Sequence, residues 1–263
     1  MAGLTIKELR DRKGGPQLTF LRIDSADDAA AAEAAGIDMI GTVYAPETRH
    51  LPGAAPSRHF RFGLPYGRHV TATEAMREAF RAIEDGAETV YTAASIHMVS
   101  EMAREGIPVI GHIGLVPPWR TWTGGYRAVG RTAQQAIELF RQAKAYEAAG
   151  AAGIEIEVVP EAVAAEITRR TTLITMSLGA GAGCDVQCLF ARDVLGSGTD
   201  RLPRHAKAYR DFAAEHRRLQ QERIDAFREF RHEVGSGGFP AKAHGVAMPE
   251  GELEDFLMEI DRV

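Results

Sequence analysis

The sequence predicts a closed (β/α)₈ barrel, and three observations lead to this fold class. Helical segments rich in Ala and Glu, most of which end at a glycine, alternate with short apolar and β-branched runs along the chain. Alternation at this spacing is typical of parallel strands joined by helical crossovers. The runs number about eight, the strand count of such a barrel. No GxGxxG motif follows the first run, which argues against an open dinucleotide-binding sheet.

The expected strands are apolar on both faces, as strands buried on both sides are. In chain order they are 18–23, 37–44, 60–64, 88–92, 107–110, 153–159 and 172–176, with a last strand near Val194. The expected helices are 27–35, 74–85, 96–105, 132–149 and 161–170. All but the last of these helices end at a glycine, the residue that most readily adopts the left-handed conformation of a helix terminus.

The connection between the second and third strands is too short for an ordinary crossover. Tyr44 and Gly63 are separated by a segment with three prolines and a glycine, whereas a crossover with its helix takes at least about a dozen residues. We therefore expect the second helix to be reduced or replaced by a loop. The cations of this loop are Arg49, His50, Arg58 and His59; they could face an anionic substrate or simply be solvated.

Composition narrows the class of protein. The chain has 263 residues and a net charge of −5, which gives no electrostatic support for binding nucleic acid. Apolar runs are too short to span a membrane, and the N-terminus lacks the apolar core of a signal peptide. Cys184 and Cys188 lie four residues apart on an expected helix, which is poor disulfide geometry. We expect a cytoplasmic protein with reduced cysteines and with neither nucleic acid nor membrane as a partner.

The C-terminal part is expected to be helical. Residues 202–234 carry apolar side chains at the spacing of an amphipathic helix: Phe212, Leu219, Ile224, Phe227 and Phe230. Pro249 and the following ELEDFLMEI indicate a short acidic helix. We expect one barrel domain over 1–263, with an extension over 202–263 that packs on the barrel or on a neighbouring subunit of a homo-oligomer.

The most distinctive segment is 111–131, GHIGLVPPWRTWTGGYRAVGR. Its second residue, His112, lies at the end of an apolar run, and a long loop of prolines, glycines, tryptophans and arginines follows. Loops of this length inside a compact domain are usually functional. We expect its part 115–131, here called the cover loop, to close over a small anionic ligand; a packed loop without a ligand is the alternative.

The candidate base is Glu157. Chemistry in these barrels lies at the C-terminal ends of the strands, and alternation puts Glu155 and Glu157 on one side of their strand, with Glu157 nearer its end. A carboxylate at an apolar barrel mouth should have a raised pKa and suit proton abstraction beside a carbonyl. Alternatively, one or both carboxylates pair with an arginine as structural ion pairs. His112, at the neighbouring strand end, is either a substrate contact or a structural histidine.

Four segments resemble the ketopantoate hydroxymethyltransferase family: 111–118 (GHIGLVPP), 124–131 (GGYRAVGR), 146–160 (YEAAGAAGIEIEVVP) and 179–196 (GAGAGCDVQCLFARDVLG). The resemblance extends from Leu4 to about His244 and implies a barrel similar to those of phosphoenolpyruvate mutases and isocitrate lyases. It implies an oligomeric enzyme that binds a 2-oxo acid through Mg²⁺, removes a proton beside the carbonyl and adds a one-carbon unit from methylenetetrahydrofolate.

The resemblance also implies roles for individual residues. Glu157 takes the position of the base, His112 that of a histidine contacting the substrate carboxylate, and the cover loop lies over the pocket. We expect the further substrate-binding residues at the strand ends and in this loop: Ser25, Gly63, Tyr66, Arg120, Tyr126, Arg131 and Ser177.

The chain departs from the family at the metal site. The family's Gly-Asp-Ser motif is matched by Val-Tyr-Ala at 43–45, its Asp-Leu-Pro-Phe by Gly-Leu-Pro-Tyr at 63–66, and its Lys-x-Glu by Tyr-Thr-Ala at 91–93. Both aspartates that would hold the metal are absent, and Mg²⁺ requires oxygen ligands. We therefore expect no metal ligands and no tight Mg²⁺ binding; nothing argues for Asp24 or Glu47 as substitutes.

Two functions fit these observations. The first is an enzyme that enolises a 2-oxo acid or a related carbonyl compound to form or break a carbon–carbon bond, with methylenetetrahydrofolate as a possible donor. Tyr44 and Tyr91 would be catalytic with Glu157 and His112, and their hydroxyls would donate hydrogen bonds to the enolate oxygen. Alternatively, the two tyrosines merely fill the pocket. The second is a non-catalytic ligand-binding or assembly paralogue. We favour the enzyme, because burying Glu157 without a use would cost stability.

Overall fold

The computed structural model describes residues 3–198, 201–260 and 262. The chain separates into two compact units, Met1–Arg210 and Asp211–Val263. They are described in turn.

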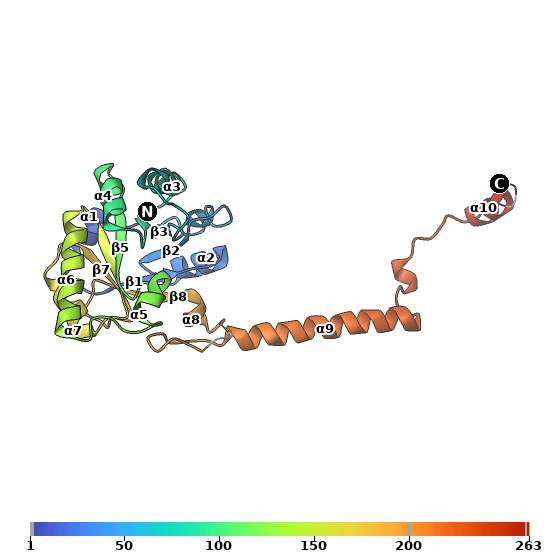
Figure 1. The fold of residues 1–263 in the computed structure, drawn as a ribbon. Coiled ribbons are helices and arrows are strands. Elements are labelled where there is room, and N and C mark those ends of the chain that lie inside the picture. Colours follow the sequence, from blue (N-terminus) through green and yellow to red (C-terminus); the bar gives the residue numbers. More distant parts are fainter. Residues whose placement is uncertain (1–2, 199–200, 261, 263) are drawn as a thin grey trace. The chain divides into compact units, whose positions relative to one another are not determined.

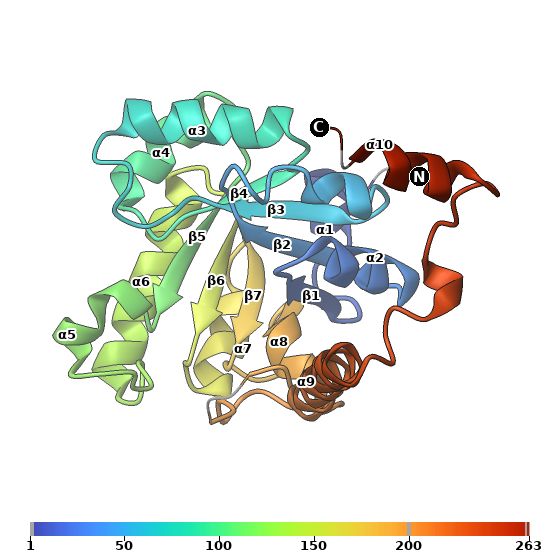
Figure 2. The ribbon, with the colours of Figure 1, turned by 90° about the vertical axis from the view of Figure 1, so that its right-hand side faces the viewer.

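The first unit is built around a closed barrel of eight parallel strands (Figures 1 and 2). Each strand pairs with the next along the chain, and the last pairs with the first. The strands are β1 (Leu18–Arg22), β2 (Met39–Val43), β3 (His59–Gly63), β4 (Thr89–Tyr91), β5 (Val109–Gly114), β6 (Gly153–Glu157), β7 (Ile174–Leu178) and β8 (Val186–Phe190). The predicted (β/α)₈ barrel is confirmed.

The crossover helices lie outside the strands (Figure 2). They are α2 (Ala26–Ala34), α3 (Ala72–Glu84), α4 (Ile96–Arg104), α6 (Ala133–Ala148), α7 (Glu161–Arg169) and the short α8 (Ala191–Leu195). The first four of these begin at a residue whose hydroxyl accepts a hydrogen bond from a backbone N–H of the first turn: Ser25, Thr71, Ser95 and Thr132. Such caps satisfy donors that would otherwise lack a partner.

Two features differ between the expected and the observed elements, and one agrees. The β2–β3 connection holds only a short 3₁₀ helix, η1 (Leu51–Ala54), so the predicted reduction of the second helix is confirmed. The last strand, however, is not near Val194, which lies in α8. The strand forms earlier, directly after the glycine-rich turn at 179–183, so Cys188 lies on β8 and Cys184 just before it rather than on a helix.

Side chains of each strand alternate between an inner and an outer core. The inner core fills the part of the barrel nearer the end where the strands begin, with residues such as Phe20, Met39 and Met176. Leu9 of the N-terminal helix α1 (Ile6–Asp11) joins this cluster, so α1 closes the end of the barrel where the strands begin. The outer core packs the opposite strand faces against the crossover helices. Where the strands begin, the buried polar residues include His59 and Thr89, whose Nε2 and hydroxyl oxygen lie 2.8 Å apart. Arg61, His112 and Glu155 lie farther along their strands.

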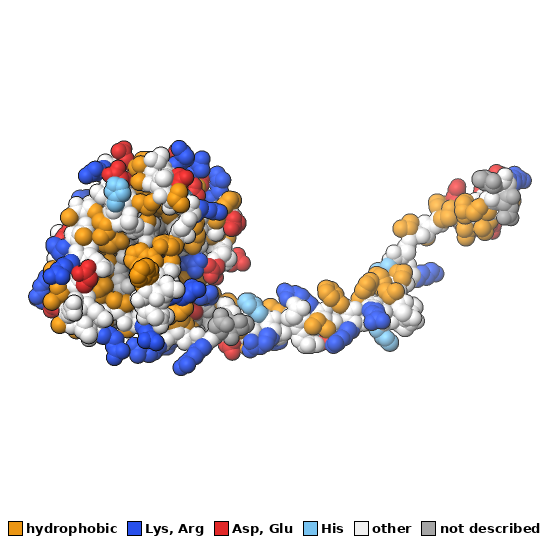
Figure 3. Space-filling view, viewed as in Figure 1, with side chains coloured by type: hydrophobic (Ala, Val, Ile, Leu, Met, Phe, Trp, Pro, Cys, Tyr) orange, Lys and Arg blue, Asp and Glu red, His pale blue; other side chains and the backbone are white. Residues whose placement is uncertain are grey.

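The second unit consists of α9 (Phe212–Ser236), the 3₁₀ helix η3 (Lys242–His244) and α10 (Glu252–Ile260). The expected amphipathic and acidic helices are thus present, although the first begins at Phe212 rather than at 202. None of the described residues of this unit is buried, and apolar side chains are exposed along it (Figure 3). Packing of the extension on the barrel or on a neighbouring subunit stays a prediction. Across the described ranges, no helix is long and apolar enough to span a membrane.

Gly111 offers a test of the outer core. A Cβ at this position would lie 2.4 Å from Cε1 of Tyr146, a buried residue of α6. We predict that Gly111→Ala lowers the free energy of unfolding by about 1–3 kcal/mol, the usual range for overpacking. Gly53→Ala is the control, because its Cβ would meet no atom within 4 Å. Urea denaturation measures both; equal stability of the two variants would contradict the packing described.

Candidate active site

A cavity of about 280 Å³ opens at the C-terminal end of the barrel. Its wall is formed by side chains of strands β1 to β4 and β6 to β8, and Pro117 and Pro118 of the cover loop lie against it. This volume is at the lower end for a small-molecule site. The position is the one at which barrels of this class carry their chemistry.

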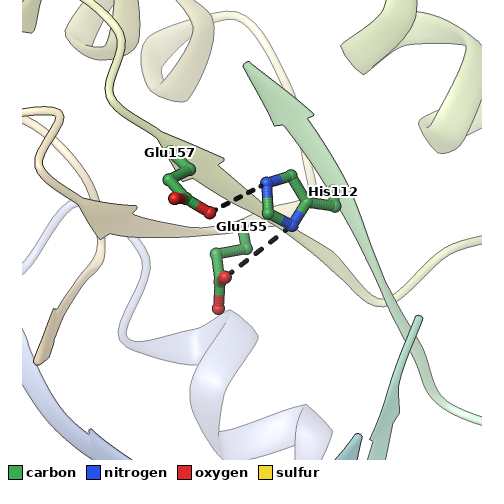
Figure 4. A group of neighbouring side chains, drawn as sticks. All are labelled: His112, Glu155 and Glu157. Carbon is green, nitrogen blue, oxygen red and sulfur yellow. Dashed lines mark ion pairs between the residues drawn. The ribbon is translucent and has the colours of Figure 1, made fainter. Parts of the chain in front are cut away.

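Three ionisable side chains meet beside this cavity: His112 from β5 and Glu155 and Glu157 from β6 (Figure 4). The strands are in register so that His112 lies opposite Glu155 and Gly114 opposite Glu157. The Nε2 atom of His112 lies 3.3 Å from Oε2 of Glu157. Its Nδ1 atom lies 3.8 Å from Oε1 of Glu155. The histidine therefore bridges the two carboxylates.

The hydrogen bonds of His112 define where its proton lies. Nε2 is 2.8 Å from the carbonyl oxygen of Leu115, and because a carbonyl only accepts, Nε2 carries a hydrogen. Nδ1 is hydrogen-bonded to the hydroxyl of Tyr91. Burial alone would lower the pKa of His112, but the hydrogen bond to Glu157 and the charges of Glu155 and Glu157 together raise it above its ordinary value.

Glu157 is half-buried at the end of β6 and lines the cavity. Burial raises the pKa of this carboxyl, and the hydrogen bond and charge of His112 oppose the rise without cancelling it. The next residue, Val158, has a φ of 49°, a left-handed conformation that is strained for a β-branched side chain. Its N–H donates to Leu178 and its carbonyl accepts from Val129. The backbone that carries Glu157 is thus fixed from both sides, and such strain is often found at functional sites.

Glu155 forms a buried ion pair. Its Oε2 lies 2.8 Å from Nη1 of Arg61 on β3, and both side chains are buried. The guanidinium carbon of Arg61 lies 4.0 Å from the ring centre of Phe20 and 4.8 Å from that of Tyr91. Of the two carboxylates, Glu155 therefore pairs with an arginine, whereas Glu157 faces a histidine.

Arg61 was missed by sequence reasoning, although a signal existed. It lies in the middle of the apolar run HFRFG, where alternation gives it the same side as Gly63. An arginine on the inner face of a barrel strand needs a partner there. Its partner is distant in sequence, which is why the pairing itself could not be predicted.

Four predicted site residues line the cavity: Gly63, Tyr66, Tyr91 and Glu157. His112 lies directly beside it, two residues before the end of β5 rather than at the end. Tyr66 and the cover loop are connected, because Nε1 of Trp119 donates to the Tyr66 hydroxyl at 2.5 Å. The loop thus reaches the cavity mouth through its prolines and this hydrogen bond.

Tyr44 is not brought to the cavity. Alternation directs Val43 to the cavity wall, whereas Tyr44 lies in the outer core, with its ring edge against Phe62. Its hydroxyl donates to Asp85 at 2.6 Å. Burial and this hydrogen bond raise the pKa of Tyr44 to about 12. A catalytic role for Tyr44 therefore has no support in this structure.

The remaining predicted residues also lie elsewhere. The hydroxyl of Ser25 caps α2, and that of Ser177 donates to the carbonyl of Gly181 within the glycine-rich turn. Arg120 and Tyr126 are exposed on the cover loop and contact each other, with a guanidinium carbon 5.9 Å from the ring centre. Arg131 is exposed near the start of α6. Because none of the five lines the cavity, we assign them no direct substrate contact.

The cations of the β2–β3 connection do not line the cavity either. Arg49 lies 3.4 Å from Asp85, Arg58 donates to the carbonyl of Ile37, and His50 is exposed. His59 is buried, with its Nδ1 against the carbonyl of Leu4, and burial lowers its pKa to about 4. It is therefore uncharged at neutral pH. The expectation that these cations face an anionic substrate is therefore not supported by the cavity.

The donor set present does not fit the Mg²⁺ that the family resemblance implies. The ligand atoms of His112, Glu155 and Glu157 lie within 4.8 Å of one another. However, Nε2 of His112 carries a hydrogen, Nδ1 is bonded to Tyr91, and Glu155 is paired with Arg61. Mg²⁺ prefers six oxygen ligands in near-octahedral geometry, and the guanidinium would repel it.

Comparison with known proteins shows which family the chain resembles. The family model for ketopantoate hydroxymethyltransferase matches residues 44–242. The 3-methyl-2-oxobutanoate hydroxymethyltransferase of Thermus thermophilus is 34% identical, over 91% of this chain and 98% of its own. Hydroxymethyltransferase 1 of Methylibium petroleiphilum, named for the same substrate, is 29% identical over 98% of this chain and 94% of its own.

Solved structures agree on the fold. A protein of Burkholderia cenocepacia described as a lyase/mutase has a TM-score of 0.51 at 12% identity, covering 96% of this chain and 95% of its own. A protein from the same organism described as a phosphonomutase has a TM-score of 0.52 at 15% identity, covering 66% and 83%. The family model and the relatives show that the chain belongs to the ketopantoate hydroxymethyltransferase family, whose members are transferases that form carbon–carbon bonds.

Proposed function

We propose that the protein removes a proton beside the carbonyl of a small 2-oxo acid without a bound metal, and that the enolate so formed makes or breaks a carbon–carbon bond. The observation that carries the proposal is Glu157, a carboxylate with a raised pKa that is held at the cavity wall by His112 and by the strained backbone at Val158. The names of the curated relatives support 3-methyl-2-oxobutanoate as the substrate to test first.

Glu157 acts as the base in this proposal. A base works best when its pKa lies closer to the working pH than that of a free carboxylate, and burial moves Glu157 in that direction. The Nε2 atom of His112 donates to the carbonyl of Leu115 and lies 3.3 Å from Oε2 of Glu157. Its contact and its charge stabilise the ionised form of Glu157, the form that accepts the substrate proton.

Tyr91 is the proposed donor to the developing enolate oxygen. Burial, together with the charge of Glu155, raises the pKa of Tyr91 well above its ordinary value, so its hydroxyl keeps its proton. When His112 is an imidazolium, its Nδ1–H donates to the Tyr91 oxygen, and the Tyr91 hydrogen is available to the cavity. A fixed donor aimed at developing charge is a strong source of rate enhancement. The one-carbon donor implied by the resemblance would act after this step.

The proposal predicts metal-independent exchange of the substrate proton. In D₂O, the β-proton of 3-methyl-2-oxobutanoate should exchange in the presence of the protein and EDTA, as followed by NMR. Glu157→Gln should slow the exchange by about 10²-fold or more, because a general base contributes on that scale. Glu138→Gln is the matched control, since this carboxylate is exposed on α6.

Each other outcome of this experiment counts against the proposal. Exchange that EDTA abolishes would show that a metal is required. Unchanged exchange in Glu157→Gln would place the base elsewhere. No exchange in the wild type would favour a non-catalytic ligand-binding paralogue.

The pH dependence of exchange gives a second prediction. Because Glu157 must be ionised, kcat/KM should rise with pH through the pKa of Glu157, which lies above the ordinary 4.5. His112 lowers that pKa by its hydrogen bond and its charge. We therefore predict that His112→Gln shifts the acidic limb of the profile to higher pH. A shift to lower pH would show that His112 does not stabilise the Glu157 carboxylate.

A further inference from the structure

We infer that Arg61 holds the anionic oxygens of the substrate in this cavity, and so does the work that a metal ion would do in binding a 2-oxo acid. The inference rests on the proposed function for the class of substrate. Anion binding by Arg61 can nevertheless be measured without any reaction.

Arg61 has donors to spare. Its Nη1 donates to Glu155 and lies 3.4 Å from the sulfur of Met176. Among the residues that the structure describes, none accepts a hydrogen bond from its Nε or Nη2, yet no fully buried polar atom lacks a partner. Both atoms must therefore be accessible, and the cavity is the space that Arg61 lines.

Nε and Nη2 form one edge of the planar guanidinium. Their two N–H bonds are parallel and match the two oxygens of a carboxylate, which makes a bidentate pair possible. Lys lacks this geometry, because its ammonium is a point charge. The free edge of Arg61 thus fits a planar anion such as the carboxylate of a 2-oxo acid.

The guanidinium is also held in place before any ligand arrives. Glu155 fixes one side of it at 2.8 Å, and the rings of Phe20 and Tyr91 pack against it. Little side-chain entropy remains to be lost on binding, so a preformed donor pair binds more tightly than a mobile one. Burial also strengthens its interaction with an anion.

The location of Arg61 agrees with the proposed base. Glu155 and Glu157 are two residues apart on β6, which is roughly 6–7 Å along a strand. A 2-oxo acid whose carboxylate lies beside the Arg61–Glu155 pair can therefore direct its third carbon toward Glu157. Tyr91 contacts both Arg61 and His112. Its hydroxyl would therefore lie near the carbonyl oxygen of a 2-oxo acid bound in this orientation.

A second arginine of the cavity, Arg22, is less suited to this role. It is half-buried and lies 3.6 Å from Asp24, and its guanidinium carbon is 5.2 Å from the ring centre of Phe190. The side chain of Asp24 is itself well exposed. Arg22 is therefore more exposed to solvent and better screened than Arg61, so we assign the anion to Arg61.

The test is calorimetric titration in EDTA with oxamate, an unreactive planar analogue of a 2-oxo acid, and with its neutral amide, oxamide. We expect the wild type to bind oxamate, and Arg61→Lys to bind it at least about 10-fold more weakly, the scale of a charge-assisted hydrogen bond. Binding of oxamide should change little. Arg49→Met is the matched control, because Arg49 lies beside a carboxylate but outside the cavity.

A double variant keeps the test decisive. Replacing Arg61 alone leaves Glu155 as an unpaired buried charge, so R61M/E155M removes both partners together. Circular dichroism and a thermal melt report whether each variant folds; if the double variant does not fold, Arg61→Lys decides. Failure of the wild type to bind oxamate, or wild-type affinity in a folded Arg61 variant, would overturn the inference.

The two proposals fail in different ways. If oxamate binds through Arg61 but no proton exchange occurs, the proposed function is wrong and the anion site stands. If exchange proceeds with an unchanged KM in Arg61→Lys, the anion site is wrong and the base proposal stands. Glu157→Gln should lose exchange but retain oxamate binding.

Discussion

The interior of this barrel depends on the buried ion pair between Arg61 and Glu155. Removing two charges from water is expensive, and attraction between them offsets that cost only when the geometry is good and other contacts help. Here the two atoms lie 2.8 Å apart, and aromatic rings flank the guanidinium. Loss of either partner alone would leave the other charge stranded among apolar side chains.

This ion pair separates two environments along the barrel axis. On the side where the strands begin, the inner core is closed by α1 and is mainly apolar, apart from the hydrogen-bonded pair His59 and Thr89. On the other side, Glu157 and Tyr91 line the cavity and His112 lies against them. Because Arg61 neutralises Glu155, His112 can be shared with Glu157 rather than held by Glu155. The charge state of Glu157 therefore depends on the Arg61–Glu155 ion pair, whose carboxylate lies two residues earlier on the same strand.

The barrel could be predicted because its signals are local. Glycine-ended helices and β-branched runs repeat regularly, and each can be recognised from a few neighbouring residues. The position of the last strand was predicted wrongly. The glycine-rich turn and the four-residue spacing of Cys184 and Cys188 were interpreted as the start of a helix, whereas the strand begins directly after the turn. The shortened second crossover followed from the prolines between β2 and β3.

The site was only partly predictable, because it depends on which face a residue occupies and on distant pairing. Glu157 and His112 were found from strand alternation and from the resemblance. Tyr44 was predicted at the site but lies outside it. A shift of one residue on a strand reverses the face, and Val43 is the residue that lines the cavity. The partner of Arg61 lies three strands farther along the chain, so its selection depends on closure of the barrel.

The central claim is that this cavity handles a 2-oxo acid with protein side chains instead of a metal. Titration of the protein with Mg²⁺ by calorimetry, alone and with 3-methyl-2-oxobutanoate, tests it most directly. The account predicts no saturable binding of Mg²⁺ in either condition and no effect of Mg²⁺ on the rate of proton exchange. Stoichiometric binding that accelerates exchange would contradict it.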